Sequence, residues 1–157
     1  MRVFELHTET DLPRPLEEVF AFFADAGNLQ AITPPSVHFR ILTPLPLEMR
    51  PGALIDYRIR LRGIPLKWRT EITDWEPPHR FVDRQLRGPY RLWHHEHTFH
   101  DLGGRTGRTS QTRMIDHVRY SVWGGALVQR LFVRRELERI FAYRQRAITG
   151  LLGEKPA

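Results

Sequence analysis

The feature that most constrains the fold is a change in hydrophobic period near residue 125. Between residues 55 and 122, apolar and polar side chains alternate in several short segments, which is typical of half-buried β-strands. Turns that contain Gly or Pro separate these segments at 63–65, 77–78, 88–89 and 103–107. From 125 to 152 the apolar residues instead recur every three, four or seven positions, as on one face of a helix. The pattern predicts an antiparallel meander followed by one long C-terminal helix.

The residues before the meander predict a further strand, two short helices and a second short strand. Residues 4–11 alternate between apolar and polar side chains and end at Pro13 and Pro15, so we expect a half-buried strand there. In chain order we then expect a helix over 16–24, a turn and second short helix over 25–33, a strand over 37–41 and a connection over 43–52.

One apolar stripe runs along the expected C-terminal helix. It consists of Val133, Leu137, Ile140, Phe141, Ile148 and Leu151. The sheet also has one apolar face, and wrapping the sheet around the helix is the simplest way to bury both. The predicted fold is therefore α+β, with a curved antiparallel sheet around the helix. The arginines from 130 to 146 are expected on a solvated face, because several stand three or four positions from a glutamate.

Length and composition favour one globular domain over residues 1–157. Of the 157 residues, 41% are hydrophobic and 27% are charged, which is a globular balance. The chain has no cysteine, which excludes disulfides, thiol catalysis and thiolate metal sites. Apolar runs fall short of the roughly 18–20 residues of a membrane-spanning helix, and the first residues lack an apolar signal segment. We therefore expect a cytoplasmic protein without stable membrane insertion.

The net charge of +6 raises the question of a nucleic-acid partner. Lys67 and Lys155 are the only lysines, so nearly all of the positive charge comes from arginine, and the arginines are scattered along the chain. Since neither a basic tail nor an aromatic RNA-binding motif accompanies them, we expect no nucleic-acid binding.

Hairpin turns predict which side chains share the inner face of the sheet, because residues that lie opposite each other point to the same side. We expect Ile59 opposite Trp68, Thr70 opposite Gln85, Ile72 opposite Asp83, Gln85 opposite His95, and Asp83 opposite His97. These registers agree on one inner face. Its aromatic members are Tyr57, Trp68, Phe81, Trp93, Phe99 and Tyr120.

The inner face also carries a polar cluster of Asp83, Gln85, His95 and His97. A buried carboxylate is costly unless it is paired, so these groups need partners, water or a ligand. A cavity with aromatic walls and a few polar groups is typical of a small-molecule site. A ligand of about 20 non-hydrogen atoms would bind there at roughly micromolar strength. The alternative is an internal network in which Asp83 holds one imidazole and Gln85 the other.

The two histidines allow two further interpretations. His95 and His97 lie on one side of a strand at a spacing that can hold zinc, with Asp83 or Asp116 as a third ligand, but a lone His-x-His pair is weak evidence and we expect no metal. Asp83 with His97 or His95 could act as a general base, since a carboxylate raises the basicity of an imidazole. Neither a nucleophile motif nor a phosphate-binding loop accompanies them, and residues 103–107 are expected to form a hairpin.

Several stretches of the sequence resemble one superfamily. They are residues 62–68, RGIPLKW; 80–90, RFVDRQLRGPY; 92–99, LWHHEHTF; 116–120, DHVRY; and 132–141, FVRRELERIF. These stretches, and the order of elements, are similar to a bacterial branch of the START and birch-pollen-allergen superfamily, also called SRPBCC. The resemblance covers nearly the whole chain. It implies the helix-grip fold and a hydrophobic-ligand cavity between the sheet and the C-terminal helix.

The resemblance and the predicted register select overlapping ligand-binding residues. The branch pattern contains Phe81, Asp83, Gln85, Trp93, His95, His97 and Phe99, and the register adds Tyr57, Trp68, Thr70 and Tyr120. Members of this branch are described as ligand-binding or as cyclase/dehydrase-like proteins, and one fold serves both roles.

We therefore expect a protein that binds a small, mostly hydrophobic molecule and needs no cofactor. One alternative is a polyketide cyclase/dehydratase-like enzyme in which Asp83 and His95 or His97 supply the base. Another is an interaction module with an exposed apolar patch around 122–131. The segment 121–127 is expected to be a tight strand-to-helix turn or a mobile mouth of the cavity. Ligand identity and oligomeric state stay open.

Overall fold

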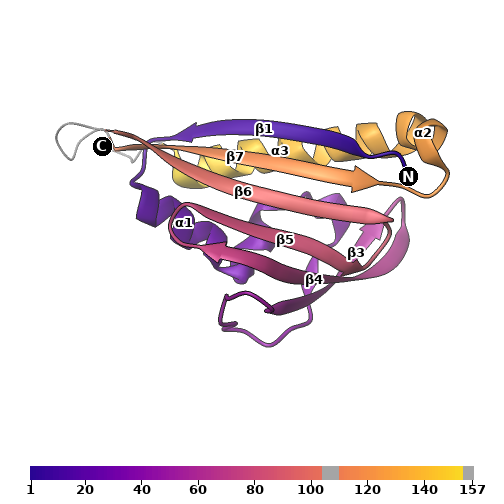
Figure 1. Cartoon of the computed structure of the whole chain (residues 1–157), viewed down its shortest axis with the longest axis horizontal. Helices are drawn as coiled ribbons and strands as arrows, with labels where there is room; N and C mark the ends of the chain where they lie inside the picture. Colours follow the sequence, from indigo (N-terminus) through magenta and orange to yellow (C-terminus); the bar gives the residue numbers. More distant parts are fainter. Residues whose placement is uncertain (104–109, 154–157) are drawn as a thin grey trace.

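The computed structural model describes residues 1–103 and 110–153, which form a curved sheet, several short helices and one long helix (Figure 1). The strands are β1 (Phe4–Leu12), β2 (Arg40–Ile41), β3 (Leu54–Leu61), β4 (Ile64–Glu76), β5 (Arg80–Arg87), β6 (Leu92–Gly103) and β7 (Gln111–Ser121). The helices are α1 (Leu16–Ala24), the 3₁₀-helices η1 (Ala26–Ile32) and η2 (Pro35–Val37), α2 (Gly125–Val128), the π-helical η3 (Gln129–Val133) and α3 (Arg134–Leu152). The expected order of elements is confirmed.

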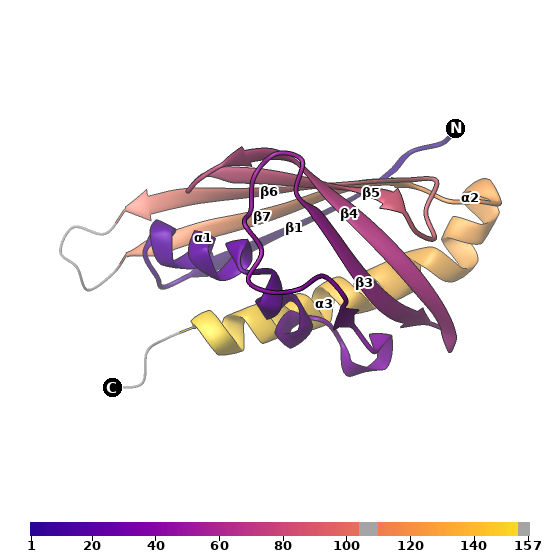
Figure 2. The same ribbon diagram turned by 90° about the horizontal axis from the view of Figure 1, so that it is seen from below.

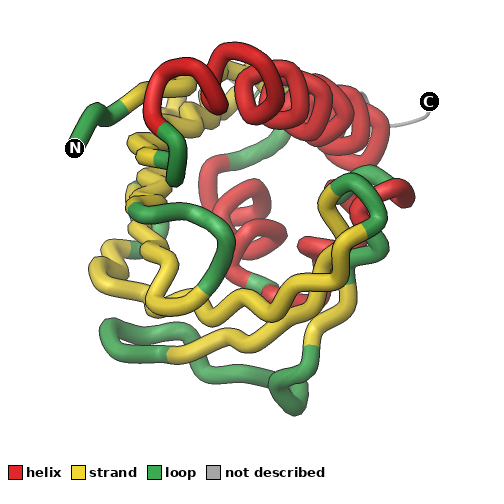
Figure 3. The backbone as a smooth tube through the Cα atoms, turned by 90° about the vertical axis from the view of Figure 1, so that its right-hand side faces the viewer, coloured by secondary structure: helices red, strands yellow, loops and turns green. Residues whose placement is uncertain are grey.

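The seven strands form one antiparallel sheet in the order β1-β7-β6-β5-β4-β3-β2. Strands β3 to β7 are neighbours in chain order, as the short turns predict, and β1 joins the far edge beside β7. The sheet curves, and α3 lies across its open side (Figure 3). This arrangement is the helix-grip fold, so the predicted fold class is confirmed. The hairpin expected over 103–107 falls mainly outside the described residues.

Helix α1 forms where the sequence has an apolar face at helical spacing. Its buried residues are Leu16, Val19, Phe20 and Phe23. The ring of Phe20 contacts Trp75 and Phe99 of the sheet, both at a centroid distance of 5.2 Å. Aromatic pairs at such distances add to the free energy that burial supplies. Helix α1 therefore packs one end of the curved sheet, and Phe23 reaches the cavity described below.

Two of the three predicted hairpin registers are shifted by two residues. The observed pairs are Tyr57 with Trp68, Ile59 with Leu66, Phe81 with His97 and Asp83 with His95. The register between β4 and β5 is as expected, with Thr70 opposite Gln85 and Ile72 opposite Asp83. Because a shift of two keeps each side chain on its own side of the sheet, the predicted inner face is retained.

The strand expected over 37–41 is wrong in its first half. Val37 ends η2, and His38 has a left-handed backbone with a φ of 49°. A left-handed residue interrupts an extended chain, so the pairing with β3 begins at Arg40.

Helix α3 buries a different set of residues from the predicted stripe. Its buried residues are Leu137, Phe141, Arg144, Ile148 and Leu152. Leu151, which was expected in the stripe, is 49% exposed, whereas Arg144, which was expected in solvent, is 7% exposed. Within the described part of the chain, no helix has the length and apolar character needed to cross a membrane.

Candidate functional site

A cavity of about 180 Å³ lies between the inner face of the sheet, η1 and α3. Strands β3 to β6 provide one wall, and Leu137, Ile140 and Phe141 of α3 provide the other. Most of the lining side chains are apolar. The cavity is in the position that wrapping the sheet around the helix predicts.

Aromatic side chains form one part of the cavity wall. Trp68 stacks on Tyr57 at a centroid distance of 5.7 Å and meets Trp93 edge-on at 5.4 Å. Burial raises the pKa of Tyr57, so its phenol stays neutral at physiological pH. The indole Nε1 of Trp68 is buried and has no hydrogen-bond partner among the described residues. This wall therefore offers apolar contact area and one unpaired donor.

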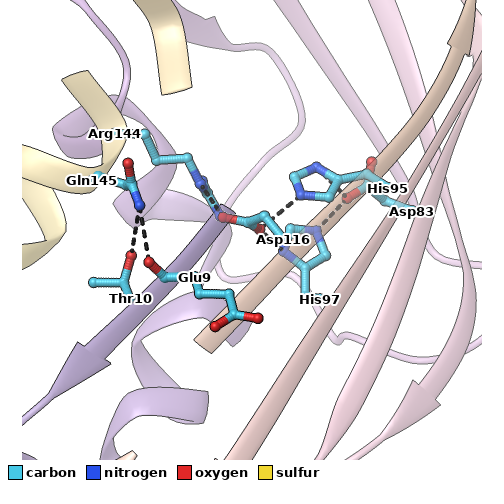
Figure 4. Close-up of polar contacts among 8 residues, drawn as sticks. All are labelled: Glu9, Thr10, Asp83, His95, His97, Asp116, Arg144 and Gln145. Carbon is cyan, nitrogen blue, oxygen red and sulfur yellow. Dashed lines mark hydrogen bonds and ion pairs between the residues drawn. The ribbon is translucent and has the colours of Figure 1, made fainter. Parts of the chain in front are cut away.

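Charged side chains form another part of the wall and continue behind it towards α3 (Figure 4). His97 Nε2 lies 2.7 Å from Asp83 Oδ2, and His95 Nε2 lies 2.8 Å from Asp116 Oδ1. Asp116 also accepts hydrogen bonds from Arg144, at 3.1 Å from Nε and 3.3 Å from Nη2. The two imidazole rings stack at a centroid distance of 3.7 Å. We call these five residues the buried charge network.

The pKa values of the two network histidines are shifted in opposite directions. Burial and the neighbouring His97 lower the pKa of His95, and the attraction of Asp116 does not reverse this. Burial also acts on His97, but the carboxylates of Asp116 and Asp83 outweigh it and raise the pKa of His97. His97 therefore keeps its proton to a higher pH than His95 does.

Both aspartates are ionised. Burial alone would raise the pKa of Asp116, but the charge of Arg144, the hydrogen bond with His95 and the close approach of His97, whose Nδ1 lies 3.1 Å from Oδ1, hold it well below its usual value. Burial also opposes the ionisation of Asp83, whose pKa is nevertheless lowered by the hydrogen bond from His97. The two carboxylates then face the Arg144 guanidinium and the two imidazoles, of which His97 holds its proton more tightly. A buried set of charges is tolerable when it is paired in this way.

The hydrogen-bond pattern fixes which atoms face a ligand. Because Asp116 Oδ1 accepts, Nε2 of the neutral His95 carries the hydrogen, and this tautomer leaves Nδ1 as an acceptor. The Asp83 side chain is 17% exposed, and its Oδ1 accepts no hydrogen bond from the described residues. Asp83 and His95 both line the cavity. Their free acceptors are among the polar groups that a ligand would meet, together with Trp68 Nε1 and the side chain of Arg144, which also lines the cavity.

Asp83, His95 and His97 also meet the distance requirement of a metal site. Each offers a ligand atom, and these atoms lie within 4.8 Å of one another. However, His97 Nε2 is already bonded to Asp83, and the raised pKa of His97 means that a divalent cation would have to displace a more tightly held proton. The geometry therefore fits a hydrogen-bonded network better than a metal site.

Most of the residues selected from the sequence line the cavity. They are Tyr57, Trp68, Thr70, Phe81, Asp83, Trp93, His95 and His97. Phe99 packs instead against Phe20 of α1, and the hydroxyl of Tyr120 accepts a hydrogen bond from Gln129. The interpretation of Gln85 as the partner of an imidazole is wrong. Its amide bonds both backbone groups of Tyr90, at 2.8 and 3.1 Å, and so holds the turn between β5 and β6.

The roles of two members of the network were not predicted from the sequence. Asp116 was considered only as a third metal ligand, and Arg144 was assigned to the solvated face of the helix. A signal for Arg144 was present, because it stands three positions after Phe141 and four before Ile148, inside the apolar stripe. The lining residues Ala26, Leu29 and Ile32 of η1 and Met49 of the connection before β3 had no such signal.

The fold and the cavity define a helix-grip protein with an internal site. The model of the family described as polyketide cyclase/dehydrase and lipid transport matches residues 12–144. The chain belongs to this family, which confirms the resemblance to the SRPBCC superfamily. Comparison with curated proteins finds no match by sequence.

Three solved structures share the fold. The Zhui aromatase/cyclase from Streptomyces sp. R1128 is 16% identical, with a TM-score of 0.74 over 96% of this chain and 94% of that chain. The major latex-like protein 151 from Panax ginseng is 10% identical, with a TM-score of 0.67 over 96% and 97%. Ara h 8.0201 is 14% identical, with a TM-score of 0.69 over 96% and 98%. At these identities the likeness is one of fold.

Proposed function

We propose that the chain binds a small, largely apolar molecule in the cavity, with a hydrogen-bond donor of the ligand directed to Asp83 and His95. One observation carries this proposal: an apolar cavity of about 180 Å³ has a wall that presents two free acceptors. A few fixed polar groups in an apolar cavity are what a small-molecule site requires. Membership of a family described by polyketide cyclase/dehydrase and lipid transport supports the same class of ligand.

The cavity volume limits the size of the ligand. An apolar cavity of about 150 Å³ holds benzene, and pockets for drug-sized ligands begin at about 300 Å³. A molecule of one or two rings therefore fits the cavity of about 180 Å³ without a rearrangement, which is smaller than the sequence suggested. About 12 non-hydrogen atoms at about 0.5 kcal/mol each give a Kd of tens of micromolar.

The polar groups set the orientation of the ligand. A hydroxyl that donates to the ionised Asp83 makes a charge-assisted hydrogen bond, which is stronger than a neutral one. The unpaired Nε1 of Trp68 suits an acceptor atom elsewhere on the same molecule. A ligand without a donor leaves Asp83 Oδ1 desolvated and without a hydrogen bond, which costs binding free energy.

Calorimetric titration with 1-naphthol and 1-methoxynaphthalene tests the proposal. The two probes share a ring system of suitable size and differ in the hydrogen-bond donor. We expect 1-naphthol to bind with about tenfold higher affinity, because the methyl ether cannot donate to Asp83. Native mass spectrometry of the freshly purified protein should also show any bound molecule that has a mass of this order.

Two matched aspartate variants separate the site from general effects on charge. Asp83→Asn should remove the preference for 1-naphthol. Asp56→Asn should keep it, because Asp56 pairs with Arg69 on the outer face. If neither probe binds and nothing co-purifies, the proposal is wrong. If both probes bind with equal affinity, the cavity binds apolar molecules but Asp83 does not orient them.

Proton abstraction from a bound substrate is a second candidate function, which the position of His95 at the cavity wall and its lowered pKa, which keeps the ring neutral, favour. His95 Nδ1 would take the proton, and Asp116 would hold the ring in the required tautomer. The Zhui protein is named an aromatase/cyclase, which is consistent with such chemistry. The probe is 1-tetralone in deuterium oxide, whose α-protons should exchange faster with the wild-type protein than with His95→Gln. Equal exchange rates would argue for binding alone.

A further inference from the structure

The stretch that enters the C-terminal helix leaves its apolar side chains uncovered. Strand β7 ends in a turn at Trp123, and α2 and η3 follow over Gly125–Val133. All of these helical residues are described, and none of them is buried. Trp123 and Leu127 are each 66% exposed, Leu131 is 50% exposed and Phe132 is 45% exposed. We call these four exposed side chains the apolar end.

Two hairpin turns reach the apolar end and bring cations to it. The guanidinium carbon of Arg62, between β3 and β4, lies 4.8 Å from the ring centre of Phe132. That of Arg91, between β5 and β6, lies 4.8 Å from a ring centre of Trp123. Figures 1 and 2 place α2 and these turns at the same end of the long axis. Cation–π contacts hold the two arginines beside the exposed rings.

This end of the molecule is basic. The segments 60–67, 86–91 and 121–133 contain Arg60, Arg62, Lys67, Arg87, Arg91 and Arg130 and neither aspartate nor glutamate. The whole chain has 24 basic and 18 acidic residues, so the two signs are mixed elsewhere. Apolar side chains surrounded by cations are complementary to a surface whose outer layer is negatively charged and whose interior is apolar.

We propose that the apolar end docks on the surface of a bilayer that contains anionic phospholipids. Trp123, Leu127 and Leu131 would enter the boundary between headgroups and acyl chains, where such side chains partition. The arginines around them would contact lipid phosphates. The chain would then lie on the bilayer without crossing it. This proposal goes beyond the ligand-binding function and does not depend on what the cavity holds.

The shape of the apolar end favours a bilayer over a protein or a nucleic acid. The four side chains line neither the internal cavity nor the surface pocket beside η1 and η2, so they project from the surface. A bilayer accepts projecting apolar side chains without a matching surface, whereas a partner protein needs shape complementarity. A nucleic-acid backbone would use the arginines and leave Leu127 and Leu131 in water.

Flotation of the full chain with vesicles tests the proposal. One set of vesicles contains phosphatidylcholine alone, and the other contains about 30% phosphatidylserine as the anionic lipid. We expect at least about tenfold more protein on the anionic vesicles near 0.1 M salt, and a strong decrease at about 0.5 M. The emission of Trp123 should shift to the blue on binding, because Trp68 and Trp93 are already buried and Trp75 is packed against the core cluster.

Matched variants compare the apolar end with equally exposed positions elsewhere. Leu131→Ser should lower vesicle binding by about tenfold, and Leu151→Ser, at 49% exposure on α3, should leave it unchanged. Arg130→Glu should weaken binding by at least tenfold, and Arg139→Glu should not. Arg139, on α3, pairs with Glu136.

Three results would overturn the docking proposal. They are equal binding to both kinds of vesicle, equal loss in Leu131→Ser and Leu151→Ser, and absence of vesicle binding. In the last case, sedimentation equilibrium and titration with duplex RNA decide whether a second copy of the chain or a nucleic acid occupies this surface. Binding of 1-naphthol is measured on the same variants, so loss of the ligand site would be recognised separately.

Discussion

Arg144 of α3 donates to both carboxylate oxygens of Asp116 on β7, at 3.1 and 3.3 Å, and both side chains are buried. The pair joins α3 to the inner face of the sheet. Asp116 also binds His95, which lines the cavity. The acceptor at the cavity wall is therefore held in place from behind by a charge pair that spans the two layers of the fold.

Breaking this pair should destabilise the protein strongly. Asp116→Asn leaves the Arg144 guanidinium buried without its counter-charge, which should cost about 3–5 kcal/mol in the free energy of unfolding. Arg144→Met should be costly for the converse reason. The double variant, Asp116→Asn with Arg144→Met, should cost less than the sum of the two, because it leaves neither charge unpaired. Urea denaturation of the four proteins measures these values, and strict additivity would mean that the two residues are not coupled.

The two histidines should titrate on opposite sides of the ordinary histidine pKa. The pKa of His97 is raised, so the stability that its charge contributes is fully present below the unfolded pKa of about 6.5. That stability is lost as the pH rises through the higher pKa of the folded state. The pKa of His95 is lowered, so its contribution has the opposite dependence and is lost as the pH falls through the lower pKa.

Long-range ¹H–¹⁵N spectra of the imidazole rings check this assignment. The nitrogen shifts of His97 should stay those of an imidazolium to a higher pH than those of His95, and the neutral ring of His95 should carry its hydrogen on Nε2. If both buried rings titrate together near 6.5, the described charge balance does not hold.

The faces of the sheet could be predicted from sequence, but two of its three hairpin registers could not. Faces follow from the two-residue period alone. Register depends on the turn, and the β3–β4 turn consists of Arg62 and Gly63, which both have positive φ, at 52° and 79°. Such a two-residue turn pairs Leu61 directly with Ile64. A non-glycine residue with positive φ is uncommon, so a turn centred on Gly63 and Pro65 was the natural expectation.

The network behind the cavity was hard to predict for a different reason. Arginine is counted as polar in a helical stripe, although its long side chain can be buried when a carboxylate meets it. The partner, Asp116, is 28 residues away in sequence, and only the packing of helix on sheet brings the two together. Asp83, His95 and His97 were easier to identify, because they stand on neighbouring strands and share one face.

Gln85 should contribute to the stability of a turn and not to ligand binding. Gln85→Ala removes two hydrogen bonds to the backbone of Tyr90 and should cost about 1–2 kcal/mol in the free energy of unfolding. A Cβ added at Gly88 would collide with the Gln85 amide, so Gly88→Ala should cost a similar amount. Because both changes remove the same contact, the double variant should cost little more than either one. The affinity for 1-naphthol should stay at its wild-type value. A loss of affinity without a matching loss of stability would mean that Gln85 contacts the ligand.

Ile148 and Leu151 should separate the observed helix packing from the stripe expected from sequence. Ile148 is fully buried in the core cluster that also contains Leu12, Phe23 and Met114. Ile148→Ala should therefore cost about 2–5 kcal/mol, as large-to-small changes in a packed core do. Leu151 is 49% exposed, so Leu151→Ala should change the free energy of unfolding by no more than about 0.5 kcal/mol. Thermal and urea denaturation of the two variants measure these changes in the free energy of unfolding. Equal losses would mean that α3 is rotated about its axis relative to the packing described, which would also remove Arg144 from Asp116.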